Sequence, residues 1–410
     1  MHVYVRFFSK GVYIKEEAPS WHLESEVQNI VMATGELPET HRALVQRVYA
    51  QPLQVETLPT PQPTPGSAVV KVLVANVIGY MKNIYNGARK YSYPTPLVAG
   101  TSAIGRVAAV GEDAVSLKPG QLVFFDCTIR GRDDPGAIIL SGIADGSSEP
   151  SRKLMRDAWR DSTYAEYARA PLENCFPLNE ALLCGSPSDG VGLGYDIARI
   201  SYIAALLVPY GGLRDIRVEP GETVIVAPAT GGFGGAAVLV ALAMGARVIA
   251  MGRKTDVLAK LAGLSSTRVK TVKITGNQEE EVAALQKFGG PADAYFDISP
   301  REAQGATYFK SAILSLRHAG RVSYMGGFLE DVPIPLRLLM RKDIKLHGKW
   351  MYSPDDVRSL VKMVEIGLLD LSESRGLVTV MGEFPLKRWE EAFDVAAKNA
   401  AVGQIALIRP

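Results

Sequence analysis

The sequence predicts an α/β protein with two domains, one rich in short β-strands and one built on a doubly wound parallel sheet. Its 410 residues suffice for two ordinary domains, each with its own core. Residues 42–196 carry short β-forming runs separated by turn residues, whereas residues 197–352 alternate strand-like and helix-like segments. Residues 353–410 regain the mixed character of the first stretch, so we expect the chain to finish in the first domain. Residues 1–41 are treated as an N-terminal extension.

The first domain is predicted from β-forming runs that proline and glycine interrupt. The clearest runs are SAVVKVLVANV (67–77) and AIGRVAAVG (103–111), and turn residues dominate PTPQPTPG (59–66). Many short strands bounded by turn residues are typical of a compact barrel-like or irregular β domain.

The second domain is predicted from strands that alternate with helices, the pattern that builds a doubly wound parallel sheet. The expected strands are TVIVAP (223–228), RVIAMG (247–252), AYFDIS (294–299) and RVSYMGG (321–327), and the expected helices include AAVLVALAMGA (236–246) and EEEVAALQKFGG (279–290).

The C-terminal stretch predicts a helix over 353–369, which Ser353 can cap and whose first turn suits Pro354. A β run (376–384), a second helix (387–399) and a closing strand (404–410) follow.

The composition is that of a globular protein, with 47% hydrophobic and 21% charged residues and a formal net charge of +2. Without a strong net charge or a basic stripe, nucleic acid is not expected as a partner. The three cysteines include no CxxC pair, which favours a reducing, cytoplasmic compartment over a disulfide framework. No apolar run approaches the roughly 20 residues that span a bilayer, so no membrane segment is expected.

The N-terminal residues suggest a hypothesis about where the natural chain starts. Met32 begins a stretch that reads as a natural start, so residues 1–31 are interpreted as an upstream extension. A deletion of residues 1–31 that abolished folding would refute this interpretation.

A glycine-rich turn between a predicted strand and a predicted helix is the strongest functional signal. In such a turn, Gly231 lets the backbone approach a pyrophosphate and Gly234 lets the helix pack closely on the strand. The helix N-terminus offers free N–H groups to the phosphates. The alternative, a merely structural turn, accounts less well for the flanking strand, helix and second strand. The predicted cofactor loop comprises Ala229, Thr230, Gly231, Gly232, Phe233 and Gly234, with Ala229 in place of the usual first glycine.

The end of the second strand indicates which dinucleotide binds. NAD-binding sites usually place an acidic residue there for the ribose hydroxyl, but this chain has Gly252 followed by Arg253 and Lys254. An acid would repel a 2′-phosphate, whereas these residues leave room and supply positive charge. NADP(H) is therefore the expected cofactor, unless the two basic residues only begin a solvated helix.

Taken together, these segments resemble the medium-chain dehydrogenase/reductase superfamily of alcohol dehydrogenases, quinone oxidoreductases and enoyl reductases. The resemblance covers about residues 42–410 and implies a GroES-like catalytic domain, a Rossmann domain and an active site between them. It rests on LVAGTSAIGRVAAVG (97–111), PGQLVFF (119–125), STYAEYARAP (162–171), the 229–234 loop, YFDIS (295–299), GRVSYMGG (320–327) and WEEAFDVAAKNAAVGQIAL (389–407).

The residues that hold zinc in the resembling alcohol dehydrogenases are replaced here. The family's Gly-His-Glu segment reads Gly100-Thr101-Ser102, and the earlier cysteine ligand would fall near Gly79-Tyr80. The four-cysteine structural zinc lobe is reduced to one cysteine, Cys127, and the five histidines are scattered. We therefore expect no metal.

Without zinc, negative charge on the substrate oxygen must be met by hydrogen-bond donors or a proton donor. In the resembling enzymes the segment equivalent to residues 76–94 lines the active site, which makes Tyr80 and Tyr91 candidate catalytic residues and Lys82 a pocket residue. Tyr91 comes nearest to the tyrosine proton donor of enoyl reductases, although its spacing from Gly87 is longer. For both tyrosines the alternative is packing, and for Lys82 it is a solvated surface position.

Other candidate residues come from the same resemblance. Thr101 replaces the zinc-binding histidine and is expected to line the pocket. Met325, Gly326 and Gly327 end a strand beside the nicotinamide, and the backbone near Trp350 borders it. Alternatively, residues 325–327 form only a tight turn, and the residues before Trp350 form a strand at the edge of a homodimer. Both interpretations can hold together.

The segment 127–164 is too long for a routine connection and is predicted to be a functional loop or lid, with Trp159 as a wall for a bulky substrate. The alternative is an insert that packs on the flank of the domain.

The leading functional hypothesis is zinc-independent hydride transfer between NADPH and a small organic carbonyl or a conjugated enone or quinone. A zinc-free alcohol dehydrogenase or ketone reductase is the competing enzyme. A catalytically inactive NADPH-binding sensor or structural partner is the alternative of another class. A panel of ketones and matching enones would discriminate among the three.

Overall fold

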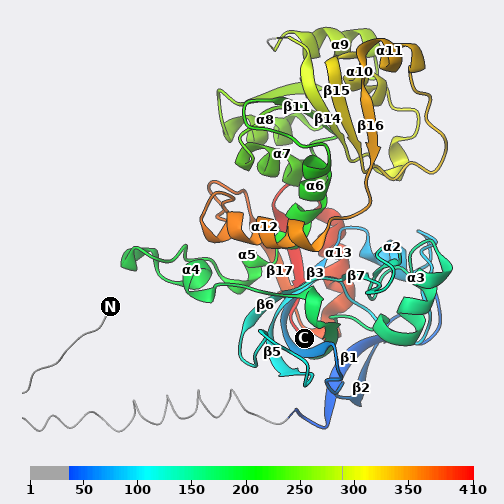
Figure 1. Cartoon of the computed structure of the whole chain (residues 1–410), viewed down its shortest axis with the longest axis vertical. Coiled ribbons are helices and arrows are strands. Elements are labelled where there is room, and N and C mark those ends of the chain that lie inside the picture. The colour runs from blue at the N-terminus through cyan, green and yellow to red at the C-terminus, as the bar shows by residue number, and fades with distance from the viewer. Residues whose placement is uncertain (1–36, 289) are drawn as a thin grey trace, which may run out of the picture. The chain divides into compact units, whose positions relative to one another are not determined.

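The computed structural model describes residues 37–288 and 290–410, so the hypothesis about residues 1–31 lies outside the described residues. The α/β class is confirmed, with a β-rich part and a parallel-sheet part (Figure 1). In the part of the chain that is described, no helix is long and apolar enough to cross a membrane.

The β-rich part is organised around a seven-stranded sheet of order β10-β6-β5-β3-β18-β17, with β9 also paired to β3. Ile408 of the last strand pairs antiparallel with Ala75 of β3, so the C-terminal strand returns to the β-rich part. The strands are β3 (Ser67–Val77), β5 (Ala103–Val110), β6 (Leu122–Phe125), β9 (Tyr167–Pro171), β10 (Cys175–Pro177), β17 (Thr379–Phe384) and β18 (Gln404–Ile408). The smaller sheets are β2 (Gln54–Pro59)-β1 (Thr40–Gln46)-β4 (Leu97–Val98) and β7 (Thr128–Arg130)-β8 (Ile138–Leu140).

The second sheet has six parallel strands in the order β13-β12-β11-β14-β15-β16, the 3-2-1-4-5-6 order of dinucleotide-binding folds. The strands are β11 (Thr223–Ala227), β12 (Arg247–Gly252), β13 (Val269–Lys273), β14 (Ala292–Asp297), β15 (Leu316–Tyr324) and β16 (Lys345–Gly348). In such sheets ligands bind at the carboxyl ends of the strands where the order reverses, here between β11 and β14.

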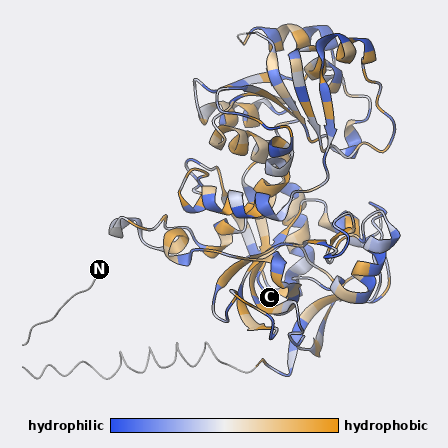
Figure 2. Ribbon diagram, viewed as in Figure 1, coloured by the Kyte–Doolittle hydropathy of each residue, from blue (hydrophilic) through white to orange (hydrophobic). Residues whose placement is uncertain are grey.

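Helices cover both faces of the parallel sheet because successive side chains of each strand point to opposite faces. Val224 and Val226 pack with α6 and α7, whereas Ile225 packs with α10. Orange, hydrophobic stretches occur on both strands and helices of this part in Figure 2. The helices are α6 (Ile203–Asp215), α7 (Gly232–Ala243), α8 (Thr255–Gly263), α9 (Gln278–Gln286), α10 (Tyr308–Leu314) and α11 (Leu336–Lys342).

The apolar core continues from the parallel-sheet part into the β-rich part. Val74, Ile104 and Phe124 belong to the same buried cluster as Leu206 of α6 and Leu360 of α12 (Pro354–Glu365). Ser353 caps α12 in a capping box with Asp356, which confirms the predicted start of this helix. The predicted final helix is α13 (Trp389–Lys398).

The long segment 127–164 is folded rather than a structureless loop. It contains β7, β8, α3 (Glu149–Leu154) and a π-helical turn (Met155–Trp159), and Ile139 and Met155 are fully buried. These buried elements show that the middle of the segment packs on the β-rich part.

Candidate active site

The predicted cofactor loop connects β11 to α7 at the point where the strand order reverses. Gly231 is the N-cap of α7 and has no side-chain cap, so backbone N–H groups of the first turn are left for a ligand. A Cβ atom added at Gly231 would meet no atom within 4 Å. The loop therefore presents open space beside a helix N-terminus, which fits a pyrophosphate.

Two other glycines of the site are required by close packing. A Cβ at Gly234 would lie 1.9 Å from the carbonyl oxygen of Pro228, which fits the expected helix–strand contact. A Cβ at Gly252 would lie 2.3 Å from Cγ2 of Thr230. Close packing against Thr230 is thus a second reason for a glycine at the end of β12, and it was not predicted from the sequence. Ala229, in the place of the usual first glycine, is completely buried, whereas Gly232 and Phe233 begin α7 and are both half-buried.

Arg253 and Lys254 follow β12 and are both exposed. Lys254 is the N-cap residue of α8, but its side chain makes no capping hydrogen bond. Within residues 37–288 and 290–410, neither side chain forms an ion pair. Their charges are therefore available to an anionic ligand.

The carboxyl ends of β14 and β15 are tied together beside the loop. The N–H of Met325 donates to the carbonyl of Asp297 at 3.0 Å, and the N–H of Gly327 donates to the carbonyl of Ser299 at 2.7 Å. A Cβ at Gly326 would lie 2.2 Å from Oδ2 of Asp297. This turn is fixed by its own packing, as the tight-turn interpretation expected, and its backbone lies at the ligand-binding edge of the sheet.

Asp297 is a buried carboxylate at this edge. It accepts hydrogen bonds from the Tyr295 hydroxyl at 2.8 Å and the Ser299 hydroxyl at 2.6 Å. Burial raises the pKa of Asp297 to about 6, although these hydrogen bonds lower it. It caps no helix, so its contacts hold the turn after β14 in place.

On the β-rich side, Thr101 and Ser102 contact Cys127, and we call Thr101, Ser102, Cys127 and Thr163 the Thr101 cluster. The Ser102 hydroxyl donates to Sγ of Cys127 at 3.3 Å, and Oγ1 of Thr101 lies 3.5 Å from the same sulfur. Thr163 accepts from the N–H of Thr101 at 3.1 Å and donates to its carbonyl at 2.5 Å. Thr101, Ser102 and Cys127 are all at least 95% buried. Thr101 and Ser102, which stand at the family's histidine and glutamate positions, thus both contact the sulfur of Cys127.

Cys127 was missed as a site residue because the sequence analysis counted it only as a remnant of a zinc lobe. Burial, followed by the nearby Asp126 carboxylate, raises the pKa of its thiol to about 11. The thiol is therefore neutral at physiological pH. In the described part of the chain, no group of three or more His, Cys, Asp and Glu residues could hold a metal ion.

Tyr80, Tyr91 and Arg89 lie together. Tyr80 precedes α2 (Met81–Tyr85), and the guanidinium carbon of Arg89 lies 3.7 Å from the centre of its ring and 5.9 Å from that of Tyr91. Burial, then the neighbouring Tyr91, raises the pKa of Tyr80, and the positive charge of Arg89 opposes this. Both candidate tyrosines are therefore brought to one place, with an arginine that the sequence analysis did not select.

Two further pocket candidates, Lys82 and Trp350, are both exposed. Lys82 is exposed and forms an ion pair with Asp394 at 2.7 Å, in keeping with the solvated alternative. Trp350 is 48% exposed after β16.

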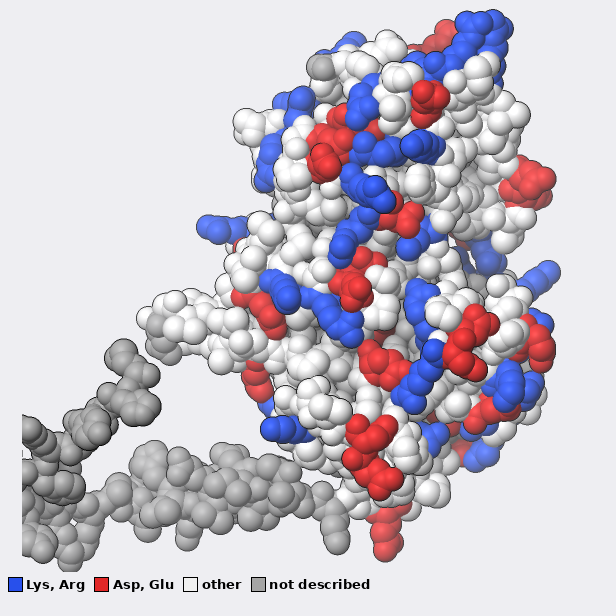
Figure 3. Space-filling model, in the orientation of Figure 1, with Lys and Arg blue, Asp and Glu red and all other residues white. Residues whose placement is uncertain are grey.

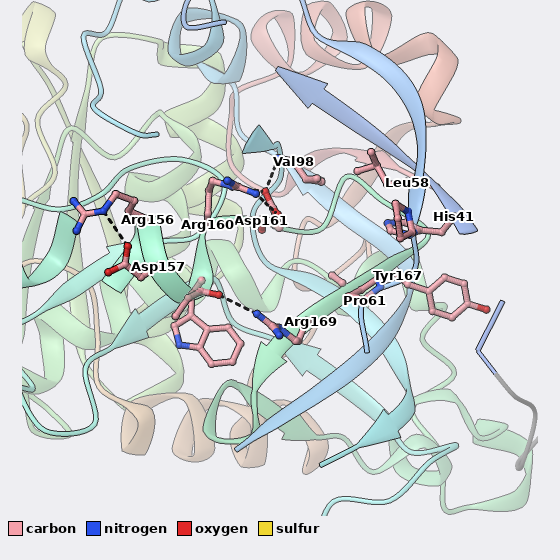
Figure 4. A pocket seen from close by; sticks show the side chains of 15 residues that line it. His41, Leu58, Pro61, Val98, Arg156, Asp157, Arg160, Asp161, Tyr167 and Arg169 are labelled. Carbon is pink, nitrogen blue, oxygen red and sulfur yellow. Dashed lines mark hydrogen bonds and ion pairs between the residues drawn. The ribbon is translucent and has the colours of Figure 1, made fainter. Parts of the chain in front are cut away.

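Trp159 lines a cavity of about 260 Å³ on the flank of the β-rich part (Figure 4). The cavity is formed with His41, Leu58 and Arg169, and no residue of the cofactor loop or Thr101 cluster lines it. Trp159 therefore lines a cavity of its own, and its role as a wall for a bulky substrate stays a prediction.

Two protein families match the chain. Residues 64–180 match the alcohol dehydrogenase GroES-like domain, and residues 232–365 match the zinc-binding dehydrogenase family. Together these ranges cover more than half of the sequence. The chain belongs to the medium-chain dehydrogenase/reductase superfamily.

Known relatives of the chain include both alcohol dehydrogenases and enoyl reductases. Alcohol dehydrogenase notN of Aspergillus sp. (strain MF297-2) is 24% identical, over 87% of this chain and 95% of the relative. The mitochondrial enoyl-acyl-carrier-protein reductase of Homo sapiens is 26% identical, over 88% of this chain and 87% of the relative. The chain is thus an oxidoreductase by family.

Solved structures share the fold at lower identity. The short chain alcohol dehydrogenase rspB of E. coli CFT073, complexed with NADH, has a TM-score of 0.71 and 18% identity, covering 91% of this chain and 100% of its own. A dehydrogenase of Sinorhizobium meliloti 1021 bound to NADP has a TM-score of 0.68 and 18% identity, with coverages of 91% and 100%. Both nicotinamide cofactors therefore occur on this fold.

Proposed function

We propose that the protein is a zinc-independent, NADPH-dependent oxidoreductase that transfers hydride to or from an organic carbonyl or a conjugated enone or quinone. The observation that carries this proposal is the Thr101 cluster. At the family's metal position stand the hydroxyl groups of Thr101 and Ser102, which contact Cys127. Zinc in proteins is held by three or four Cys, His, Asp or Glu ligands, and of these residue types the cluster offers only one cysteine.

The cofactor is assigned to the loop and to the end of β12. The open backbone of Gly231 and the N-terminus of α7 receive the pyrophosphate, and Arg253 and Lys254 receive the ribose 2′-phosphate. Met325, Gly326 and Gly327 border the nicotinamide. When bound, the cofactor supplies the hydride.

The protein's own contribution is to stabilise charge on the substrate oxygen. Tyr80 stays protonated at neutral pH because burial raises its pKa, so its hydroxyl can donate a hydrogen bond or a proton to that oxygen. Tyr91 lies beside it as a second donor. We assign the Thr101 hydroxyl to the pocket because it stands at the position of the family's metal-binding histidine.

The sharpest test of the cofactor assignment is the double change Arg253→Ala with Lys254→Ala. Because a charge-assisted contact contributes roughly 1.5–3 kcal/mol, NADPH affinity should fall about ten- to a hundred-fold while NADH affinity changes little. Lys260→Ala, an exposed lysine of α8, is the matched control. Fluorescence titration in which the unmodified protein binds NADH as tightly as NADPH would refute the NADPH preference.

The reaction type is tested separately. A ketone and its matching enone should be offered with NADPH while the loss of cofactor absorbance is followed. Turnover of the enone favours the reductase, and turnover of the ketone alone favours the alcohol dehydrogenase or ketone reductase alternative. Tight NADPH binding without turnover on a broad panel would favour a sensor or structural partner.

A cytoplasmic homodimer is the proposed form of the enzyme. Strand β16 is at the edge of the parallel sheet, and exposed apolar residues gather near it, including Leu329, Leu336 and Met340 at 67–71% exposure. An edge strand with an apolar surround is suited to pairing with a second copy. Light scattering that gave a monomer, or a dimer unchanged by Leu336→Glu with Met340→Glu, would refute this form.

A further inference from the structure

Two arginines meet where the segment after α2 touches the end of the parallel sheet. Nη1 and Nη2 of Arg301 lie 3.5 and 3.4 Å from the carbonyl oxygen of Arg89. Arg301 follows the turn after β14, to which the N–H of Gly327 is hydrogen-bonded. The Arg301 guanidinium thus contacts the backbone of Arg89, whose own guanidinium packs on the candidate tyrosines.

Neither guanidinium has an acidic partner in the described part of the chain. The Nε atoms of both Arg89 and Arg301 are buried and have no hydrogen-bond acceptor. Arg89 also donates no side-chain hydrogen bond to any described residue, although a guanidinium carries five N–H donors. Its guanidinium lies over the ring of Tyr80, with the ring of Tyr91 farther away.

Unpaired, partly buried guanidinium groups are unusual because a buried donor without an acceptor is costly. Arginines elsewhere in the β-rich part show the usual solution, since Arg42, Arg106 and Arg132 each pair with a glutamate. Charges of both signs are interspersed over the face of the molecule that Figure 3 shows. Arg89 and Arg301, in contrast, have no counter-charge among the ion pairs of the described residues. A ligand anion would supply it, and guanidinium groups suit carboxylate and phosphate.

We propose that Arg89 and Arg301 bind an anionic group of the substrate, so that the substrate is a carbonyl or enone compound that also carries a carboxylate or a phosphate. This inference rests on the proposed function of the same site. The cofactor's phosphates are already assigned to α7 and to Arg253 and Lys254. Arg89, in contrast, packs on Tyr80, the proposed donor to the substrate oxygen, so its anion belongs to the substrate.

The test compares an acid with its neutral ester. The keto acid 4-oxopentanoate and its methyl ester are titrated calorimetrically into the NADP⁺-loaded protein, and NADPH oxidation by each is followed in parallel. The unmodified protein should bind the acid about ten- to a hundred-fold more tightly than the ester. Arg89→Gln and Arg301→Gln should each collapse this ratio, whereas Lys90→Gln, which removes an equal charge from the next residue, should keep it.

The outcomes separate this inference from the function on which it rests. Equal affinity for acid and ester in the unmodified protein, or a ratio unaffected by Arg89→Gln and Arg301→Gln, would overturn the anion site. An acid-to-ester affinity ratio that falls equally in Lys90→Gln would also overturn it, because the preference for the acid would then come from general positive charge and not from Arg89 and Arg301. If Arg89→Gln instead weakens NADPH binding by the same factor, the anion is the cofactor's and the substrate assignment is wrong. Acid-selective binding without turnover of any carbonyl or enone would support the anion site and refute the enzyme.

Discussion

The cofactor loop and the Thr101 cluster are both parts of one proposed active site, but they are built from different atoms. The loop offers backbone N–H groups, and its key positions are glycines whose missing side chains leave room for a ligand or for a neighbouring strand. The cluster consists of side chains that three separate segments bring together, residues 101–102, 127 and 163. The loop can therefore bind a ligand because its glycines have no side chains in the way. The cluster depends instead on the hydroxyl and thiol groups of its side chains.

The largest effect is expected where the backbone packs most closely. Gly234→Ala places a Cβ 1.9 Å from the Pro228 carbonyl oxygen, so it should cost more than about 4 kcal/mol or prevent folding. Gly231→Ala, whose Cβ meets open space, should keep its melting temperature within a few degrees but bind NADPH at least about tenfold more weakly. Circular dichroism and fluorescence titration measure the two effects. Equal destabilisation by both changes would contradict the distinct roles of the two glycines.

The second prediction concerns the side-chain half of the site. Tyr80→Phe keeps the ring under Arg89 and removes the hydroxyl, so kcat should fall about 10²-fold or more while the dissociation constant of NADPH is unchanged. Tyr91→Phe tests whether the Tyr91 hydroxyl also donates to the substrate oxygen. Tyr49→Phe, at a tyrosine 38% exposed on the flank, is the control. Steady-state kinetics in which Tyr80→Phe retains full kcat would remove Tyr80 from the mechanism.

A smaller, pH-dependent effect is expected next to the Thr101 cluster. Burial raises the pKa of Asp126 from 3.8 to about 6, and its carboxylate accepts a hydrogen bond from the Tyr352 hydroxyl at 2.7 Å. Because the folded state holds this proton more tightly than the unfolded chain, the contribution of Asp126 to stability is largest below about pH 4 and is lost as pH rises to about 6.

Asp126→Asn keeps an acceptor for Tyr352 but removes the charge. The free energy of unfolding of the variant relative to the unmodified protein should therefore increase between pH 4 and pH 7, by up to about 3 kcal/mol. Asp133→Asn, at an exposed aspartate, should show no such trend. Urea unfolding at a series of pH values measures both free energies of unfolding. If their difference does not change with pH, the pKa of Asp126 is not raised in the folded protein.

The contrast between the two regions also explains what the sequence could predict. The cofactor loop is a local feature, because strand, glycines and helix are contiguous, and the predicted strands 67–77 and 247–252 match β3 and β12 residue for residue. The capped start of α12 was also predictable from Ser353 and Pro354. Such features depend on neighbouring residues and leave a pattern in the sequence.

The rest depends on contacts between distant residues and left no such pattern. The contact of Thr101 and Ser102 with Cys127 spans about 25 residues, and that of Arg301 with Arg89 spans more than 200. Thr230 packs so closely on Gly252 that a side chain at position 252 would clash with it. The sequence does not reveal this second reason for a glycine there. The segment 127–164 was predicted to be a loop or lid because of its length, whereas its buried residues fold it against the β-rich part.

The central claim, that this family member works without zinc, is tested most directly by measuring metal content and activity on the same sample. The protein should be produced in zinc-supplemented medium, analysed by elemental mass spectrometry, and assayed for NADPH oxidation before and after dialysis against a chelator. We predict far less than one zinc per chain and undiminished activity after dialysis. One zinc per chain, lost together with the activity and restored with it, would show instead that the enzyme depends on zinc.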